Sequence, residues 1–283
     1  MSEAQTLLLG FLAGATILLG LPLGRLRAPS PALRQFLNAV AIGVLLFLLW
    51  DVLASAWAPL DAALGKVHGH TGGLGPVLGY AILFLVGLLT GLMSLVGYER
   101  WLSGRGRPRP HGPGAMSAAE LAARRVGVAE WSPARRLALL IAVGIGLHNF
   151  GEGLAIGGSA ASGEISLATV LVIGFALHNA TEGFGIVAPL AAAADRPSWS
   201  FLLLMGLIGG GPTVLGTAVG RQFTSEAVSV VFLTLAAGSI LYVIVQLLGT
   251  AHRAGRRELL YWGLLAGLAG GFLTDMVVTA GGA

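Results

Sequence analysis

The chain has 283 residues, of which 55% are hydrophobic and only 11% are charged, and its mean hydropathy is +0.82. This composition excludes a soluble globular protein and indicates a polytopic membrane protein. The absence of cysteine excludes disulfides and thiolate ligands, and the net charge of +4 is no evidence for nucleic-acid binding, because basic residues in a membrane protein first report topology.

Eight apolar runs each come close to the ~20 residues that a helix needs to cross a bilayer. They are Thr6–Gly24, Phe36–Trp57, Leu74–Tyr98, Leu137–Gly158, Ile165–Ala188, Trp199–Gly220, Ala227–Gly249 and Leu259–Ala280. The N-terminus lacks the basic segment of a signal peptide, so we expect the first run to be retained as a span. The sequence therefore predicts an all-α membrane helix bundle that forms a single transmembrane domain over residues 1–283.

The basic residues predict how the chain is oriented. Fifteen arginines lie after the first, third, fifth and seventh runs or just before the runs that follow them, whereas only Lys66 and Arg221 fall on the other side. The positive-inside rule then places both termini outside the cytoplasm, in a plasma (inner) membrane. The longest connection, about residues 99–136, is rich in Gly, Pro and Arg. We expect it to be a flexible cytoplasmic loop that contacts anionic lipid headgroups.

A polar motif occurs in the middle of both the fourth and the fifth run. The two copies are His148-Asn149-Phe150-Gly151-Glu152-Gly153 and His178-Asn179-Ala180-Thr181-Glu182-Gly183. Residues i and i+4 share one face of a helix, so the histidine and the glutamate of each copy should lie together. Ionisable groups at membrane depth cost at least a few kcal/mol and usually mark an ion or substrate pathway.

The short connection between these runs, residues 159–164, predicts antiparallel neighbouring helices. In register, His148 lies level with Glu182 and Glu152 with His178, about 6 Å apart along the axis at 1.5 Å per residue. The imidazole, carboxylate and amide groups of both motifs would then converge on a mixed nitrogen and oxygen site, which suits zinc, iron(II) or manganese. The alternative is a buried hydrogen-bonded network that only joins two helices.

The paired motifs resemble those of the ZIP (Zrt/Irt-like) divalent-metal transporters, whose fourth and fifth helices carry His-Asn-x-Pro-Glu-Gly or close variants. The span count, the long third loop and the Gly-rich last helices resemble that family too. The resemblance implies eight transmembrane helices in a 3+2+3 arrangement that import a divalent cation by alternating access. It implies zinc as the substrate, with iron, manganese or cadmium as alternatives, no prosthetic group and no enzymatic activity, and it leaves a homodimer open.

The resemblance also assigns roles to particular residues. Those expected to bind the metal are His148, Asn149, Glu152, His178, Asn179 and Glu182. Asp51, in the second run, is expected to lie on the pathway at the outer entrance, because members of the family often carry Asp or His near the end of this span. Asp275, Gln246 and the histidines of His68-Gly69-His70 are weaker candidates.

The chain departs from the family pattern at two points. Gly151 and Thr181 replace the prolines of the two motifs, so the helix kinks there should be weaker. Gly211 replaces a glutamate that precedes the proline of the sixth helix in relatives with a two-metal centre. We therefore expect one well-formed metal site, and a second site once Gly211 is replaced by Glu. The stretch Gly209-Gly210-Gly211-Pro212 also predicts a break or kink at mid-depth, for a transport site or for packing alone.

Two other functional classes fit a buried metal site. An intramembrane zinc-dependent hydrolase would use the metal to activate water, but the sequence has no His-Glu-x-x-His and no third histidine at mid-depth. A proton or cation channel could use the same pore. Saturable uptake would indicate a carrier, and metal-dependent cleavage of lipid or peptide would indicate the enzyme.

Overall fold

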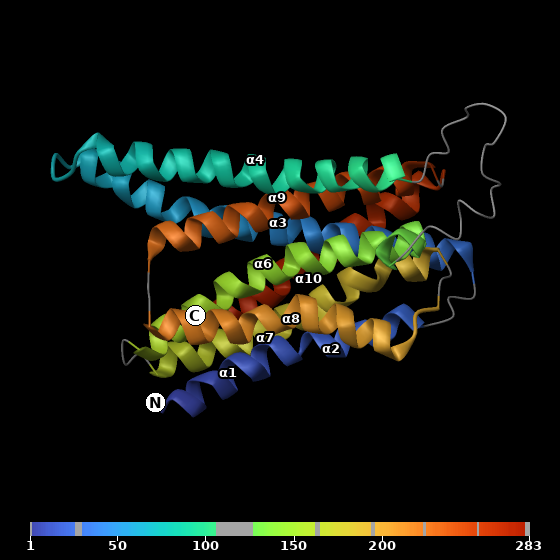
Figure 1. Cartoon of the computed structure of the whole chain (residues 1–283), viewed down its shortest axis with the longest axis horizontal. Helices are drawn as coiled ribbons and strands as arrows, with labels where there is room; N and C mark the ends of the chain where they lie inside the picture. The colour runs from blue at the N-terminus through green and yellow to red at the C-terminus, as the bar shows by residue number, and fades with distance from the viewer. Residues whose placement is uncertain are drawn as a thin grey trace.

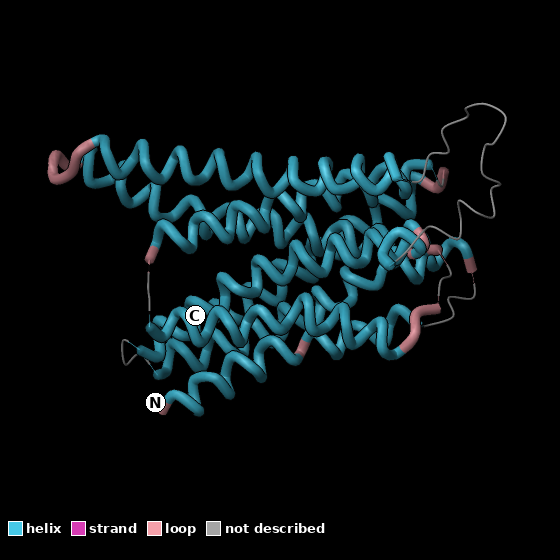
Figure 2. Tube along the Cα trace, viewed as in Figure 1, coloured by secondary structure: helices cyan, strands magenta, loops and turns pink. Residues whose placement is uncertain are grey.

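The computed structural model describes residues 2–25, 30–105, 127–161, 165–193, 196–222, 225–253 and 255–280, and every regular element in these segments is a helix. The helices are α1 (Glu3–Ala15), α2 (Ile17–Gly20), the 3-10 helix η1 (Leu21–Arg25), α3 (Pro31–His68), α4 (Leu74–Arg105), the 3-10 helix η2 (Gly127–Glu130), α6 (Pro133–Ala161), α7 (Ile165–Ala192), α8 (Trp199–Gln222), α9 (Glu226–Arg253) and α10 (Arg257–Ala280) (Figure 1). The long helices run side by side, with loops at the two ends of the bundle (Figure 2).

The predicted all-α membrane bundle is confirmed. Within the described residues, seven helical segments are long and apolar enough to cross a membrane, and α7, with 28 residues, contains the fifth predicted run. The largest difference is α3, whose 38 residues continue well beyond the predicted end at Trp57. A helix of 38 residues is about 57 Å long, nearly twice the thickness of the hydrocarbon core. The hydropathy pattern predicts only the part of the helix that lies in the membrane, so it does not predict the full length of α3.

Both chain ends lie at the same end of the bundle, together with the turn between α3 and α4 (Figure 1). An even number of spans requires this arrangement. We call it the predicted outer end, because the arginine distribution assigns it to the outside. The opposite end holds the C-terminus of α4 at Arg105 and the start of α6 at Pro133. Between them, residues 106–126 of the expected flexible loop lie outside the described residues.

The first span is interrupted near its middle, and its apolar pattern does not predict this. α1 ends at Ala15, and after Thr16 the chain continues as α2 and then as η1. The Thr16 hydroxyl donates a hydrogen bond of 2.6 Å to the carbonyl oxygen of Ala13. Such a bond offers the backbone an alternative to the regular helical pattern. The interruption lies beside the second polar motif, because the same Ala13 oxygen also accepts a bond from Asn179.

Of the break or kink expected in the sixth run, the break is absent, because α8 is helical without a gap from Trp199 to Gln222, and a kink at Pro212 stays a prediction. Two glycines of the Gly-Gly-Gly-Pro stretch serve close packing against the first span instead. A methyl group at Gly210 would run into the carbonyl oxygen of Gly14, and one at Gly209 would lie 2.7 Å from Cδ1 of Ile17. Small residues that let backbones approach in this way are typical of membrane helix interfaces.

The helices form two groups. α1, α2, α6, α7 and α8 pack on one another and contain both polar motifs, so we call them the motif bundle; α3, α4, α9 and α10 form the flanking bundle. Glycines bring backbones together inside each group. A methyl group at Gly153 of α6 would meet the Thr213 oxygen of α8, and one at Gly267 of α10 would meet the Val40 oxygen of α3.

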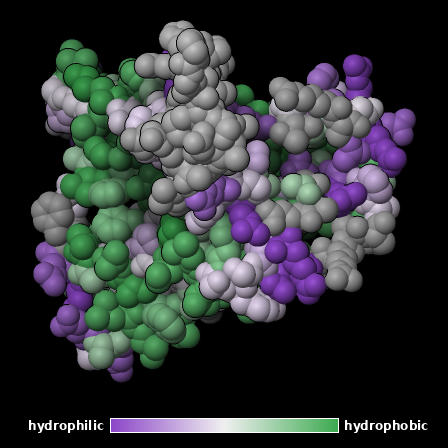
Figure 3. Space-filling view, turned by 45° about the vertical axis from the view of Figure 1, so that its right-hand side comes forward, coloured by the Kyte–Doolittle hydropathy of each residue, from purple (hydrophilic) through white to green (hydrophobic). Residues whose placement is uncertain are grey.

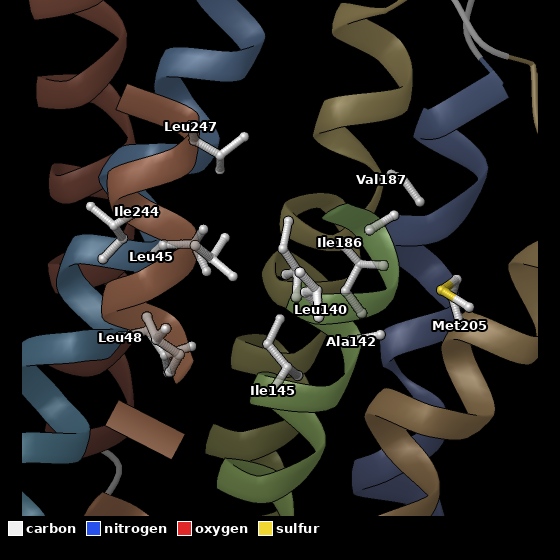
Figure 4. Packing of buried hydrophobic residues seen from close by; sticks show 14 of the residues in the cluster. Leu45, Leu48, Leu140, Ala142, Ile145, Ile186, Val187, Met205, Ile244 and Leu247 are labelled. Carbon is white, nitrogen blue, oxygen red and sulfur yellow. The ribbon is translucent and has the colours of Figure 1, made fainter. Parts of the chain in front are cut away.

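Contacts between the two bundles involve mainly side chains, although backbones also approach at Gly144 of α6, where an added methyl group would lie 3.7 Å from the carbonyl carbon of Ser239 in α9. At Gly185 of α7, an added methyl group would lie 3.9 Å from Cδ2 of Leu45 in α3, and at Gly151 of α6 it would lie 3.1 Å from Cδ2 of Leu233 in α9. Buried aliphatic residues fill this seam between α3 and α9 on one side and α6 and α7 on the other (Figure 4). They include Leu45, Leu48, Leu140, Ile145, Ile186 and Ile244.

The lateral surface is largely apolar, and hydrophilic residues gather toward the ends of the helices (Figure 3). On α4, for example, Leu78, Ile82, Leu85 and Leu89 are each about 60% exposed. Such a surface is expected of helices that face lipid acyl chains.

Candidate metal-binding site

Three polar residues of the first motif are buried in the middle of α6. His148, Asn149 and Glu152 are 3%, 0% and 5% exposed. His148 and Glu152 lie one helical turn apart, and Nε2 of the histidine is 3.2 Å from Oε1 of the glutamate. The predicted i, i+4 pairing is therefore present in this motif.

The second motif meets the first from α7. Glu182 is fully buried, and its Oε1 lies 3.7 Å from Nε2 of His148. The level placement of His148 with Glu182, predicted from the short connection and the helical rise, is thus observed. The matching pair of Glu152 with His178 remains a prediction, because the side chain of His178 lies outside the described side chains.

The two asparagines are oriented by backbone groups of neighbouring helices. Nδ2 of Asn149 donates a hydrogen bond of 3.0 Å to the carbonyl oxygen of Gly209 in α8, and Nδ2 of Asn179 donates one of 2.9 Å to that of Ala13 in α1. Both side chains are fully buried. Because each amide donates its N–H to the backbone, its oxygen is left as an acceptor, and neither Oδ1 has a hydrogen-bond partner among the described residues.

The carboxylates carry further unsatisfied oxygens. Within the described part of the chain, Oε2 of Glu152 and both carboxylate oxygens of Glu182 have no hydrogen-bond donor. Buried carboxylates of this kind are costly unless a cation or a proton compensates them. The described side chains contain no group of three His, Asp or Glu residues already arranged to enclose an ion. Instead, Nε2 of His148 lies between the two glutamates.

The site opens into a cavity of about 670 Å³ that extends toward the predicted outer end. We call it the outer cavity, and its lining includes His148, Glu152, Asp51, Ser159 and Glu226. Asp51, the pathway residue expected from the sequence, is half-buried there on α3. Glu226, the first residue of α9, was missed because it lies where the seventh apolar run begins and looks like an ordinary helix-end charge.

A second cavity of about 380 Å³ lies at the other end of the same seam. Its polar lining includes Asn38 of α3, Glu99 of α4, and Tyr242 and Gln246 of α9. Oε2 of Glu99 accepts hydrogen bonds from the Tyr242 hydroxyl at 2.6 Å and from Nε2 of Gln246 at 3.1 Å. Gln246 was a candidate predicted from the sequence, whereas Glu99 was expected in the loop. The buried aliphatic residues of the seam separate this inner cavity from the metal site.

The histidines of the outer turn lie apart from these groups, whereas Asp275 lies within electrostatic range of Asp51. His68 ends α3, and His70 follows in the turn with a φ of 55°; both are exposed. Asp275 is half-buried on α10. None of the three lines the outer cavity as far as the structure describes it.

The expectation that a glutamate at position 211 adds a second site does not fit the structure, because Gly211 does not face the site, whereas the single well-formed metal site stays a prediction. One turn before and one turn after it on α8, Leu207 and Leu215 are 67% and 62% exposed on the lateral surface. A methyl group at Gly211 would contact only the Leu207 side chain, at 3.5 Å. A glutamate at this position would therefore face lipid and could not supply a carboxylate to a second metal.

We predict that Gly211→Glu leaves the number of bound zinc ions per chain unchanged while lowering stability. A carboxylate facing lipid at mid-depth costs on the order of a few kcal/mol. Calorimetric zinc titration and thermal unfolding in detergent would measure both effects. Gly211→Ala is the matched control and should change neither, because its methyl group has room. An additional tight zinc site in Gly211→Glu would show that this face of α8 reaches the metal after all.

Comparison with known proteins supports the interpretation of this site as a metal-binding site. Residues 117–274, more than half of the chain, match the family described as ZIP Zinc transporter. The zinc transporter ZupT of Shigella flexneri is 31% identical over 284 aligned residues, which cover 97% of this chain and 98% of that protein. ZupT of Salmonella newport (strain SL254) is 35% identical over 157 residues, which cover 55% of this chain and 50% of that protein. The chain belongs to the ZIP family of zinc transporters.

Proposed function

We propose that this protein moves zinc across the membrane into the cytoplasm by alternating access. The observation that carries the proposal is the buried junction of α6 and α7, where His148 lies between the carboxylates of Glu152 and Glu182 at the closed end of the outer cavity. In the loaded site, these three side chains would bind the ion. The amide oxygens of Asn149 and Asn179, with His178, would complete or flank the coordination.

The ligand chemistry favours a transported zinc ion over a permanently bound one. Imidazole and carboxylate groups are common zinc ligands, and the chain has no cysteine to supply a thiolate. Neutral amides bind weakly, which allows the release that transport requires. An incoming cation would replace the contacts of His148 with the two glutamates. The relatives reported above are named zinc transporters, and membership of a transporter family argues against the hydrolase alternative. Iron(II), manganese and cadmium remain candidate substrates.

The direction of transport follows from combining the cavity with the predicted topology. The outer cavity is lined by Ser159 at the end of α6 and by Ser225 before α9. Both lie at the end of the bundle that the arginine distribution assigns to the outside. With this topology, the metal site would be open to the outside and closed toward the cytoplasm by the seam, as a carrier that loads zinc from outside requires.

The two bundles suggest how access alternates. Both polar motifs belong to the motif bundle, whose helices are joined by close glycine contacts, as are those of the flanking bundle. The seam between the bundles has mainly side-chain contacts, which can rearrange more readily than the close backbone contacts inside each bundle. We propose that the motif bundle moves against the flanking bundle, so that the site leaves the outer cavity and reaches the inner one. The 3+2+3 arrangement stays a prediction, because the contacts group the first span with the fourth to sixth, and the second and third with the seventh and eighth.

The predicted topology can be tested by labelling single cysteines, because the chain has none of its own. We expect Gly69→Cys to react with a membrane-impermeant thiol reagent from outside intact cells. Ser103→Cys should react only after the membrane is opened. Gly69 lies in the turn between α3 and α4 and Ser103 in the last turn of α4, so the pair reports opposite ends of one helix. The reverse pattern would contradict the proposed direction of transport.

A further inference from the structure

The outer cavity is lined by more acidic groups than the metal site alone requires. Among its described lining residues, Asp51, Glu152 and Glu226 carry carboxylates, and none is Lys or Arg. Glu152, at the buried end, is only 5% exposed, and its Oε2 has no hydrogen-bond partner in the described part of the chain. A buried carboxylate oxygen that lacks a partner and faces a cavity is costly unless a cation or a proton compensates it, and this supports the entry of a cation there. The cavity thus presents acidic groups at its mouth, along its wall and at its end.

Glu226 occupies the mouth of this cavity. It is exposed at the first position of α9, where its carboxylate is held by a helix of the same bundle: the Tyr80 hydroxyl of α4 donates a hydrogen bond of 2.7 Å to Oε2. Leu233 lies seven residues further along α9, about 10 Å along the axis, and its side chain packs at Gly151, beside Glu152. Glu226 is therefore about two helical turns outward from the metal site.

We propose that Glu226, positioned by Tyr80, captures divalent cations at the mouth of the outer cavity and delivers them past Asp51 to the site. This inference rests on the proposed loading of zinc from outside. Acidic groups in a cavity with low-dielectric walls raise the local cation concentration and the association rate. A single carboxylate binds a divalent ion weakly enough to pass it on. The bond from Tyr80 uses Oε2, so Oε1 can face the incoming ion.

The test is the initial rate of zinc uptake into proteoliposomes, measured against zinc concentration at about 20 mM and about 500 mM salt. At low salt, Glu226→Gln should raise the apparent KM about three- to fivefold with kcat unchanged, as expected for one charge acting on a divalent ion over about 10 Å. At high salt the difference should vanish, because the screening length falls below this distance. Tyr80→Phe should shift the KM in the same direction by a smaller factor.

Asp61→Asn is the matched control. Asp61 is an exposed carboxylate near the outer end of α3, and it does not line the outer cavity. Equal KM shifts for Asp61→Asn and Glu226→Gln would overturn the inference, because they would reflect general surface charge. A fall in kcat without a change in KM would also overturn it, because that pattern indicates a structural role for Glu226.

Stopped-flow measurement of zinc association with the purified protein separates failure of this inference from failure of the proposed function. If wild type transports no zinc, the import proposal fails on that result alone. Whether Glu226 captures zinc is then decided by the association rate of zinc, which Glu226→Gln should lower about three- to fivefold at low salt. An unchanged rate would overturn capture by Glu226 whether or not the protein transports.

Discussion

Replacing Glu152 or His148 by alanine is expected to reduce zinc uptake by the reconstituted protein to the level of empty liposomes. Their side chains lie 3.2 Å apart in the buried site, and His148 also contacts Glu182. Loss of groups that only support metal ligands typically costs 10- to 100-fold in metal affinity or activity, so loss of a ligand should cost at least about as much. Glu258→Gln, which alters an exposed carboxylate at the start of α10, should transport normally.

Thermal stability distinguishes a functional site from a helix-joining network. If Glu152 serves only to hold α6 and α7 together, Glu152→Gln should lower the Tm. If it is a metal ligand, the same variant should lose uptake while its Tm in the absence of metal is unchanged or raised. A neutral side chain removes a buried charge whose Oε2 has no hydrogen-bond partner among the described residues. Retained uptake together with a lower Tm would support the network.

Crosslinking the two bundles is expected to abolish transport reversibly. Leu45 of α3 and Gly185 of α7 face each other across the seam, where a methyl group at Gly185 would lie 3.9 Å from the Leu45 side chain. A short bifunctional reagent that forms a disulfide with each cysteine should bridge these positions and prevent the motif bundle from moving. We expect uptake to fall at least about tenfold and to recover on reduction, because alternating access requires this relative motion.

The control is a crosslink inside the motif bundle. Leu18 of α2 and Gly206 of α8 are in direct contact there. Cysteines at these two positions, bridged by the same reagent, should leave uptake close to that of the uncrosslinked protein. Equal inhibition by both crosslinks would contradict the assignment of the moving group, and full activity of the crosslinked Leu45–Gly185 pair would contradict motion along the seam.

The residues of the site could be predicted from sequence because two simple regularities determine them. Helical periodicity brings His148 and Glu152 together, and a short connection between two spans places Glu182 beside them. Both regularities hold however α6 and α7 are rotated together within the bundle. The positions of the other helices therefore do not affect the prediction of these site residues. The same is true of the spans, which follow from apolar length alone.

The rotation of α8 could not be derived in this way. In a helix of a soluble protein, polar residues mark the exposed face. In a membrane helix such as α8, the lipid-facing and the packed face are both apolar, and they differ only in the size of their side chains. Leu207 and Leu215 mark the lipid face, whereas Gly206, Gly210 and Gly216 mark the packed face. Gly211 is a small residue on the lipid face, so residue type alone placed it wrongly.

The interruption of the first span also depends on tertiary structure. A threonine in an apolar helix commonly bonds to its own backbone without ending the helix. At Thr16 the interruption lies where Gly14 and Ile17 pack against the glycines of α8, and the Ala13 carbonyl beside it accepts a bond from Asn179. These partners come from helices about 160 to 200 residues away, and a local sequence pattern does not contain them.

The most direct test of the central claim is zinc uptake by the purified protein in liposomes, with iron(II), manganese and cadmium measured in parallel. We predict saturable zinc entry above empty liposomes, which Glu152→Ala eliminates. Saturation would identify a carrier, whereas a rate that rises linearly with zinc concentration would indicate a channel through the same site. Absence of uptake for all four metals, in either orientation of the protein and at several pH values, would contradict the assignment of this site to metal transport.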